Sequence, residues 1–429
     1  MEENRENFEY EPAQQKKKKD PKVIAIAVLA SLLCLVLLAG LVYFVMVGSK
    51  NGGKVDDTTA QTTAPAAPEV QPSKTYTVDD ETAHLNSGAV IATAGDMELT
   101  NGEMMIYYNM FLAQNSYSLY YYGVDLSKPM DQQWYDQANN LTWQQAIVEE
   151  SLNKWHAYAA VYQHALAQGF QPDEEAQNYM NSIDGMLQEA LQELEYQSVE
   201  EMLDKEMGAG STLQGYKNFM VIPYLANLYV EEFKEQCQPT MDEIEQYFTE
   251  NEAALTAAGV SKESGHVIDV RHVLITPEGG TAEGDTTVYS EDEWEACRQK
   301  AEDLLNTWLA GDKTEESFAE LANKESTDPG SNTNGGLYEN VTKDYMVPEF
   351  DAWIFDESRV YGDYGLVKTN YGYHIMYFVE RNPSWIHTVS ETIAEERLNT
   401  MLQEAVEKYD LTVYDERICL GDITKTEEQ

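Results

Sequence analysis

Basic residues are scarce in this sequence. Its 429 residues include 28 lysines and arginines against 75 aspartates and glutamates, which gives a formal net charge of −47 at pH 7. Because a nucleic-acid binder needs a basic face to neutralise phosphates, this balance excludes a nucleic-acid partner. An acidic surface keeps a protein soluble through self-repulsion, and it also attracts basic or unfolded chains at long range. The sequence leaves both interpretations open.

Cysteine is also rare, with four residues in the chain. Cys34 lies inside an apolar run, and the other three, Cys237, Cys297 and Cys419, cannot all pair with one another. A disulfide between Cys237 and Cys419 is one pairing that remains open. The chain contains no C-x-x-C motif, no P-loop, no H-E-x-x-H and no G-x-S-x-G. We therefore expect neither a metal ion nor a cofactor.

A long uncharged apolar run extends from Val23 to Val47. As a helix of about 25 residues it would be ~37 Å long, enough to cross a hydrocarbon core of about 30 Å. The lysine-rich segment Lys16–Lys22 precedes it, so the positive-inside rule places the N-terminal tail in the cytoplasm. A cleavable signal peptide has a shorter apolar region of about 7–15 residues followed by small residues, unlike Val45-Met46-Val47. We predict a single-pass signal anchor, with the bulk of the chain outside the cell membrane.

The segment after the anchor has the composition of a disordered linker up to about Gly88. Folded sequence resumes with a strand, a Gly-Asp turn and a second strand over Ala89–Leu99, followed by a capping box at Thr100–Glu103. From there to about Ala258 the pattern is helical throughout, and further capping boxes begin at Ser198 and Thr240. These features predict a bundle-like helical lobe.

The first helix of this lobe is rich in methionine and tyrosine, including Met104, Met105, Tyr107 and Tyr108. Such side chains either pack in the helical core or form an adaptable surface for unfolded chains. Tyr120-Tyr121-Tyr122 cannot all face one side of a helix, so we expect part of this aromatic surface to be exposed.

Strands and helices alternate in the next part of the chain. We expect strands over Val267–Thr276, Tyr364–Thr369 and Tyr373–Glu380, and helices over Glu291–Ala310, Glu315–Lys324 and Val347–Phe355. A Gly-rich insertion follows the first strand at Pro277–Thr287. After this α+β segment, a helix over Thr388–Tyr409 and a short strand over Leu411–Ile418 are expected.

Several short motifs occur in a fixed order in this α+β segment. They are Val270–Ile275, Phe318–Ala322, Ser326–Ser331, Gly335-Gly336, Met346–Phe350 and Lys368–Met376. Their order and spacing resemble the parvulin family of peptidyl-prolyl cis/trans isomerases. The resemblance implies a four-stranded antiparallel sheet wrapped by helices. With its flanking segments, the whole chain resembles membrane-anchored extracytoplasmic foldases of the PrsA/SurA type.

This resemblance implies a domain organisation in which the parvulin domain is inserted into a helical chaperone domain. The expected parts are a cytoplasmic tail (1–22), a transmembrane anchor (23–47), a linker (48–88), the N-terminal chaperone part (89–264), the parvulin domain (265–382) and a C-terminal helical part that packs on the chaperone domain (383–429).

The parvulin reaction needs no nucleophile, because it rotates an X-Pro peptide bond against a resonance barrier of about 18–20 kcal/mol. It needs an apolar pocket for the proline ring and polar groups that favour the twisted amide. The resemblance assigns the catalytic role to four polar residues: His272, Asp328, Thr369 and His374. It assigns the pocket to Met346 and Phe350, with Leu337 or Tyr338 opposite.

Structural roles remain open for several of these residues. The two histidines are alternatively a hydrogen-bonded pair that fixes the sheet. Asp328 is alternatively a cap of its loop, and Met346 and Phe350 are alternatively ordinary core residues. The family usually continues Gly-Gly-Asp-Leu-Gly, whereas this chain has Gly335-Gly336 followed by Leu337-Tyr338-Glu339-Asn340. One pocket-forming loop therefore differs from the family pattern.

The leading functional hypothesis is a prolyl isomerase and chaperone that assists newly secreted or cell-envelope proteins with X-Pro bonds. The alternative is a non-catalytic holdase in which the parvulin domain only binds peptides. A scaffold for cell-envelope assembly is also compatible with the anchor and linker, and a homodimer is compatible with the sequence.

Overall fold

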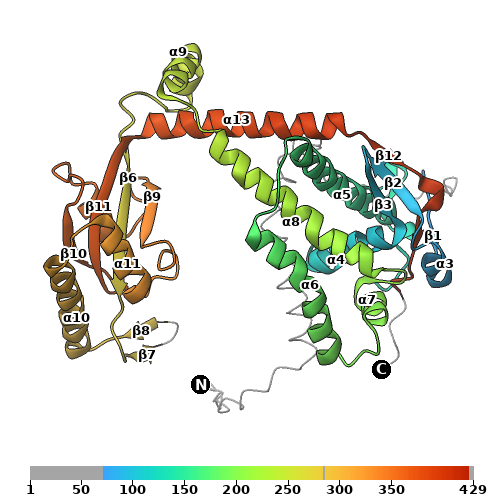
Figure 1. Ribbon diagram of the computed structural model, residues 1–429, viewed down its shortest axis with the longest axis horizontal. Helices are drawn as coiled ribbons and strands as arrows, with labels where there is room; N and C mark the ends of the chain where they lie inside the picture. The colour runs from blue at the N-terminus through green and yellow to red at the C-terminus, as the bar shows by residue number, and fades with distance from the viewer. Residues whose placement is uncertain (1–70, 284–285, 425–429) are drawn as a thin grey trace, which may run out of the picture. The chain divides into compact units, whose positions relative to one another are not determined.

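The computed structural model describes residues 71–283 and 286–424 (Figure 1). The predicted cytoplasmic tail, the anchor and linker residues 48–70 lie outside this range. The end of the predicted linker is folded, as a strand (Thr77–Val78) and a short helix (Asp80–Leu85), so the prediction of disorder is wrong there. Among the described residues, no helix is both long and apolar enough to cross a bilayer. The chain divides into two compact units, which we describe separately: the first contains the described parts of Met1–Gln236 and Leu398–Gln429, and the second contains Cys237–Arg397.

The first unit combines helices with small sheets. Its helices are α3 (Asp80–Leu85), α4 (Asn101–Tyr121), α5 (Trp143–Ala167), α6 (Glu174–Glu193), α7 (Val199–Met207), α8 (Leu213–Gln236) and the end of α13 (Ser384–Lys408). β2 (Val90–Ala94) and β3 (Met97–Thr100) form the predicted hairpin, and β12 (Leu411–Val413) pairs antiparallel with β2. β1 (Thr77–Val78) pairs parallel with β13 (Cys419–Leu420). The C-terminal segment thus completes sheets that begin more than 300 residues earlier in the sequence.

The prediction of helix throughout this unit is wrong between α4 and α5. This segment contains β4 (Trp134–Asp136), β5 (Leu141–Thr142) and two short 3-10 helices, Met130–Gln132 and Gln137–Asn139. Asp136 accepts hydrogen bonds from the amides of Ala138 and Asn139, and Asn140 adopts a left-handed conformation. Such local side-chain bonding competes with helix formation.

Two of the three predicted capping boxes are incomplete. Thr100 accepts a hydrogen bond from the Glu103 amide, but the Glu103 carboxylate accepts from Asn218 Nδ2 of α8, at 2.8 Å, instead of returning to Thr100. At Ser198, the Glu201 carboxylate accepts from the preceding amide, that of Gln197. The box at the start of α9 (Met241–Ala257), which joins Thr240 and Glu243, is complete.

The aromatic helix α4 has two different halves. Met104, Met105, Tyr107 and Tyr108 are buried in the core, together with residues of α5, α7 and α8. Near its end, Tyr117, Tyr120 and Tyr121, with Tyr122 directly after it, are 72–82% exposed. Core packing is therefore confirmed for the first half of the helix and the expected aromatic exposure for its end, while binding of unfolded chains stays a prediction.

The second unit contains a four-stranded antiparallel sheet, as the parvulin resemblance implied. Its strand order is β10 (Tyr364–Lys368), β11 (Tyr373–Pro383), β6 (His266–Ile275) and β9 (Leu337–Val341). α10 (Glu291–Ala310) and α11 (Glu315–Glu325) cover one face around Val273 and Ile375, and α12 (Pro348–Ile354) covers the other around Val270 and Met376. α9 packs separately against the start of α13, where Phe248 contacts Trp385.

The strand β11 extends three residues beyond its predicted end at Glu380, and α13 begins at Ser384 instead of Thr388. A β-bulge between Phe378 and Glu380 shifts the register, after which β11 continues to pair with β6 as far as His266. The predicted strand Leu411–Ile418 is shorter than expected, because β12 ends at Val413 and a 3-10 turn, Asp415–Arg417, follows. In the Gly-rich insertion the chain forms a small hairpin of β7 (Thr281–Glu283) and β8 (Thr286–Val288).

The three cysteines outside the predicted anchor, Cys237, Cys297 and Cys419, are buried free thiols. Burial raises the pKa of the Cys297 thiol, which donates a hydrogen bond to the carbonyl of Ile275. Each of these thiols therefore behaves as a small apolar packing group. The pairing of Cys237 with Cys419, left open by the sequence, is not formed in the structure.

Candidate active site

The two histidines of the second unit lie on adjacent central strands. In the register of β6 and β11, His272 is opposite Met376, and His374 is opposite Leu274. Because opposite residues and alternate residues share a face of a sheet, both histidines lie on the face covered by α12. Both are buried, with 3% and 5% of their surface exposed.

The two imidazoles contact each other directly. Their rings are nearly parallel, at 17°, with centroids 5.1 Å apart, and the two Nδ1 atoms are 2.9 Å apart. Two nitrogens at this distance need one donor and one acceptor. The pair therefore orients each ring through the other.

The loop that follows α11 brings Asp328 to the first histidine. The amide of Thr327 donates to the carbonyl of Leu274 on β6, which fixes the loop to the strand. Asp328 Oδ2 then lies 2.9 Å from His272 Nε2 and 2.6 Å from Ser331 Oγ. It also accepts a hydrogen bond of 3.0 Å from the Tyr338 hydroxyl.

The second histidine is held from the other side by Thr369. Thr369 Oγ1 lies 2.8 Å from His374 Nε2 and accepts a hydrogen bond from the amide of Tyr371. The turn between β10 and β11 places it there, since the amide of Thr369 donates to the carbonyl of Gly372. The four polar residues suggested by the sequence are thus joined in one chain of hydrogen bonds.

The donor at one end of this chain follows from Asp328. An ionised carboxylate only accepts, so His272 Nε2 donates to Asp328. At the other end, Thr369 Oγ1 accepts from the Tyr371 amide and is the hydrogen-bond partner of His374 Nε2. Each nitrogen of the imidazole pair therefore has a partner.

The ionisation of the groups agrees with this assignment. Burial and the neighbouring His272 lower the pKa of His374 to about 3, so its imidazole is neutral at physiological pH. The hydrogen bond from His272 holds the pKa of the Asp328 carboxyl well below its usual range, although partial burial acts in the opposite direction. Burial and the hydrogen bond to Asp328 raise the pKa of Tyr338 to about 12, so its hydroxyl remains a donor.

An apolar wall stands over the histidine pair. The Phe350 ring of α12 contacts both imidazoles edge-on, with centroid distances of 5.4 Å. Met346, one turn earlier in the sequence, is partly buried in the same apolar cluster, as is Tyr338. The Tyr338 ring also lies 5.4 Å from that of His272.

The pairing of β6 with β9 distinguishes between the two residues that the sequence suggested for the opposite wall. Tyr338 is opposite Val270 and therefore shares the face of the histidines. Leu337 is opposite Arg271, whose side chain pairs with Glu315 at the start of α11 on the other face. The structure thus brings Tyr338 to the site and places Leu337 on the other side of the sheet.

A steric constraint explains the glycine directly before β9. Gly336 has φ +71°, and an added Cβ would lie 2.2 Å from the carbonyl oxygen of His272. The chain must pass this close to β6 because the His272 amide donates to the Gly336 carbonyl. Only glycine combines this conformation with this approach.

Ser331 is a polar member of the site that the sequence did not single out. Its side chain is fully buried, donates to Asp328 Oδ2 and lies 3.1 Å from His272 Nε2. The signal that was available is the spacing Asp-x-x-Ser in a Gly- and Asn-rich loop, which is typical of local side-chain hydrogen bonding.

Comparison with known proteins agrees with this geometry. Residues 255–382 match the model of the PPIC-type PPIase domain. The chain is 27% identical over 243 residues to a protein named Foldase protein PrsA from Halalkalibacterium halodurans. This alignment covers 55% of this chain and 62% of the relative. It is 32% identical over 144 residues to a protein named Chaperone SurA from Pseudomonas fluorescens. This alignment covers 33% of this chain and 29% of the relative.

Among solved structures, the crystal structure of PrsA from Bacillus subtilis matches 64% of this chain and 89% of its own, with 19% identity and a TM-score of 0.33. The alignments thus span less than two thirds of the two curated relatives. The second unit contains a parvulin-type peptidyl-prolyl isomerase domain. Over the aligned parts, the chain is similar to proteins named Foldase protein PrsA and Chaperone SurA.

Proposed function

We propose that this protein is a peptidyl-prolyl cis/trans isomerase and chaperone that acts on newly secreted or cell-envelope proteins outside the cell membrane. The observation that carries the proposal is the buried chain Thr369–His374–His272–Asp328 beneath the Phe350 ring. In this proposal the tail, anchor, linker, chaperone and parvulin parts follow the order expected from the sequence, and the linker ends before β1 at Thr77. The N-terminal anchor holds the folded units near the membrane.

The proposed reaction uses the site as a rigid, hydrogen-bonded platform. An X-Pro bond in its planar form is stabilised by resonance, and this resonance is lost when the bond twists. An apolar wall of Met346 and Phe350 removes water from the proline ring, and the fixed dipoles below favour the twisted amide. Since the His374 imidazole is neutral and both rings are buried, we assign to the pair the role of positioning Asp328 and the sheet.

Asp328 is the residue we assign to the substrate side of the network. Its side chain is 15% exposed, whereas that of His272 is 4% exposed, so the carboxylate is the more accessible of the two. With three donors on Oδ2 it is held in one orientation. An ordered carboxylate next to an apolar wall can interact differently with the planar and twisted amide, which is the requirement for catalysis.

The test is the proline-limited refolding of a denatured protein, with the full-length protein in mild non-ionic detergent added at substoichiometric amounts. Uncatalysed isomerisation takes tens to hundreds of seconds, so catalysis is visible as a faster slow phase. The expected result is acceleration that Asp328→Ala and Met346→Ala abolish while circular dichroism shows that both variants fold. If the unsubstituted protein is folded and the rate of the slow refolding phase does not change, the isomerase proposal is refuted.

A non-catalytic holdase is the second candidate, and one observation favours it. The exposed tyrosines at the end of α4, Tyr117, Tyr120, Tyr121 and Tyr122, form an aromatic surface on the first unit. Tyrosine offers large contact area with a polar end, which suits varied unfolded chains. Replacing all four with Ser should reduce suppression of client aggregation and leave refolding catalysis unchanged. Equal suppression by the variant would show that clients bind elsewhere.

A further inference from the structure

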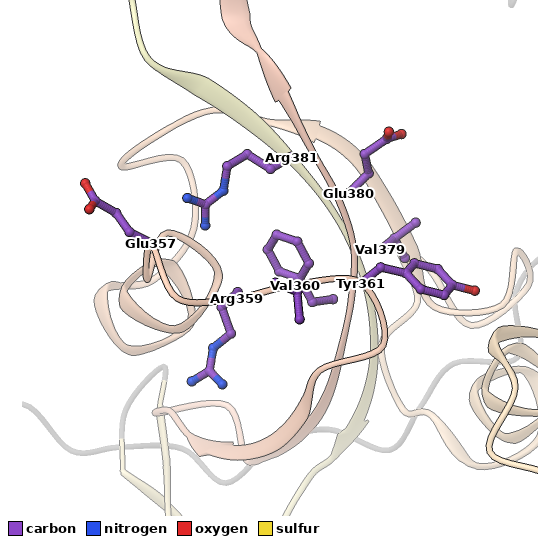
Figure 2. A pocket seen from close by; sticks show the side chains of 8 residues that line it. Glu357, Arg359, Val360, Tyr361, Val379, Glu380 and Arg381 are labelled. Carbon is purple, nitrogen blue, oxygen red and sulfur yellow. The ribbon is translucent and has the colours of Figure 1, made fainter.

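The second unit contains an open pocket of about 610 Å³ that is separate from the histidine network (Figure 2). It is lined by Glu357, Arg359, Val360, Tyr361, Phe378, Val379, Glu380 and Arg381. Phe378 is four residues beyond His374 on β11, about 13 Å along the strand, and no lining residue belongs to the histidine network. The pocket is therefore a distinct candidate binding site.

A β-bulge delivers one arginine to this pocket. Before the bulge Phe378 is opposite Val270, and after it Arg381 is opposite Ile268. Val270 and Ile268 share one face of β6, so Phe378 and Arg381 also share that face. Without the extra residue, Glu380 would occupy the position of Arg381. Bulges that redirect a side chain in this way are common next to functional sites.

The second arginine comes from the loop that joins α12 to β10. This loop is fixed to β11, because the amide of Gly362 donates to the carbonyl of Phe378 and the amide of Phe378 donates to the carbonyl of Asp363. The Arg359 guanidinium stacks 4.2 Å from the Trp353 ring. Figure 2 shows Arg359 and Arg381 reaching to the same side of the pocket, whereas Glu380 extends in the opposite direction.

The two guanidinium groups have unused hydrogen-bonding capacity. Arg381 donates through Nη2 to the carbonyl of Asp356, whereas its buried Nε has no partner within the described residues. No carboxylate in the described part of the sequence lies within 4.0 Å of Arg381, and Arg359 reaches only Asp356, at 3.9 Å. In a protein with 75 acidic residues this is unusual.

The other arginines of the second unit have close carboxylate partners. Arg271 lies 2.9 Å from Glu315, Arg298 pairs with Glu295, and Arg397 pairs with Glu243. An arginine fork without a close carboxylate partner is suited to bind a carboxylate from outside through two parallel hydrogen bonds. The exposed Val360 and the buried Phe378 add an apolar surface beside the forks.

We propose that the Arg359/Arg381 pocket binds a peptide carboxylate that lies next to an apolar side chain. The volume is within the range of pockets for small ligands, about 300–1,000 Å³, and thus accommodates a carboxylate and one neighbouring side chain. Charge complementarity selects the carboxylate, and Val360 and Phe378 accommodate the neighbouring apolar group. This site is independent of the prolyl site and requires no proline in the ligand.

The test is fluorescence anisotropy with the full-length protein in non-ionic detergent and a dye-labelled, C-terminally amidated peptide, Gly-Leu-Glu-Leu-Asp-Gly. A matched peptide carries Gln and Asn in place of the acids. We expect the acidic peptide to bind about tenfold tighter than the neutral one and to weaken severalfold as salt rises from about 0.05 to 0.3 M. Equal binding of the two peptides would overturn the proposal.

Four variants locate the site. Arg359→Gln and Arg381→Gln should each weaken acidic-peptide binding about tenfold, because each removes one bidentate donor. Glu357→Gln changes an exposed residue and removes a negative charge that repels the ligand carboxylate. It should therefore strengthen binding about twofold. Arg298→Gln is the matched control, since it removes one positive charge from α10 of the same unit. A loss with Arg298→Gln as large as with Arg381→Gln would show a general charge effect and overturn the proposal.

The source of the carboxylate is distinguished by a free-acid version of the neutral peptide. Binding of that peptide would assign the site to the terminal carboxylates of peptides. Failure of that peptide to bind, together with binding of the amidated acidic peptide, would assign it to Asp and Glu side chains. Both results support a carboxylate site, and each must disappear in Arg381→Gln.

Discussion

The buried Glu103 makes the stability of the first unit strongly dependent on pH. Glu103 has no exposed surface, and its carboxylate accepts a hydrogen bond from Asn218. Burial raises its pKa from 4.5 to about 8, while the Asn218 bond acts in the opposite direction. The folded unit therefore retains a proton that the unfolded protein releases above about pH 4.5.

The sign follows from this difference in bound protons. Between about pH 4.5 and 8 the folded state binds more protons than the unfolded state, so the free energy of unfolding falls as pH rises. At about 1.4 kcal/mol per pH unit, the loss between pH 5 and 8 is roughly 3 kcal/mol. Glu103→Gln has no titrating group at this position and should remove that part of the slope.

The assay is urea unfolding of the full-length protein at pH 5, 6, 7 and 8, monitored by tryptophan fluorescence. Glu189→Gln, an exposed substitution on α6 of the same unit, serves as the matched control. We expect Glu103→Gln to gain stability relative to the native protein as pH rises, and Glu189→Gln to follow the native protein. A constant difference between Glu103→Gln and the native protein from pH 5 to 8 would refute the reasoning.

Three further predictions concern the second unit. Gly336→Ala should destabilise this unit by about 2 kcal/mol or more, because φ is +71° and the new Cβ would meet the His272 carbonyl. Urea unfolding measures the change in stability, and an unchanged stability would contradict the strain argument. Tyr338→Phe removes one of three donors to Asp328, so it should cost about 1 kcal/mol and slow refolding catalysis severalfold, less than Asp328→Ala does; an unchanged rate would show that the hydroxyl does not position Asp328. The pKa of Asp328 is lowered in the folded state, so its contribution to stability is present at neutral pH and is lost as pH falls below about 4. Asp328→Asn should be less stable than the native protein at pH 6, and the difference should shrink in acid titration; a pH-independent difference would contradict the assigned ionisation.

The sequence predicted the elements with strong local signals. The helix α10 has the predicted bounds, since a complete capping box at Ser290 and Glu293 starts it and Gly311 follows its last residue. The four-stranded antiparallel sheet also agrees with the expectation from the parvulin resemblance. Local capping signals are sufficient to define the helix, whereas the sheet was expected from the resemblance.

Features that depend on tertiary contacts were not predictable in the same way. Glu103 has the sequence pattern of an exposed cap, yet α8 packs against the first turn of α4 and buries its carboxylate. The choice between Leu337 and Tyr338 depends on the register of β9, which the alternation of residues does not specify. The bulge that places Arg381 beside Phe378 has no local sequence signal either. Each of these outcomes is determined by pairing between segments distant in sequence.

The most direct test of the proposed isomerase is exchange NMR of a short peptide with a single X-Pro bond, recorded with a catalytic amount of the full-length protein in detergent. With a mixing time of about 0.5 s, the free peptide shows no exchange between cis and trans signals, because uncatalysed exchange takes tens of seconds or more. The account expects exchange cross-peaks with the native protein and none with Asp328→Ala. Line broadening that shows binding, without exchange cross-peaks, would contradict catalysis and leave a peptide-binding domain.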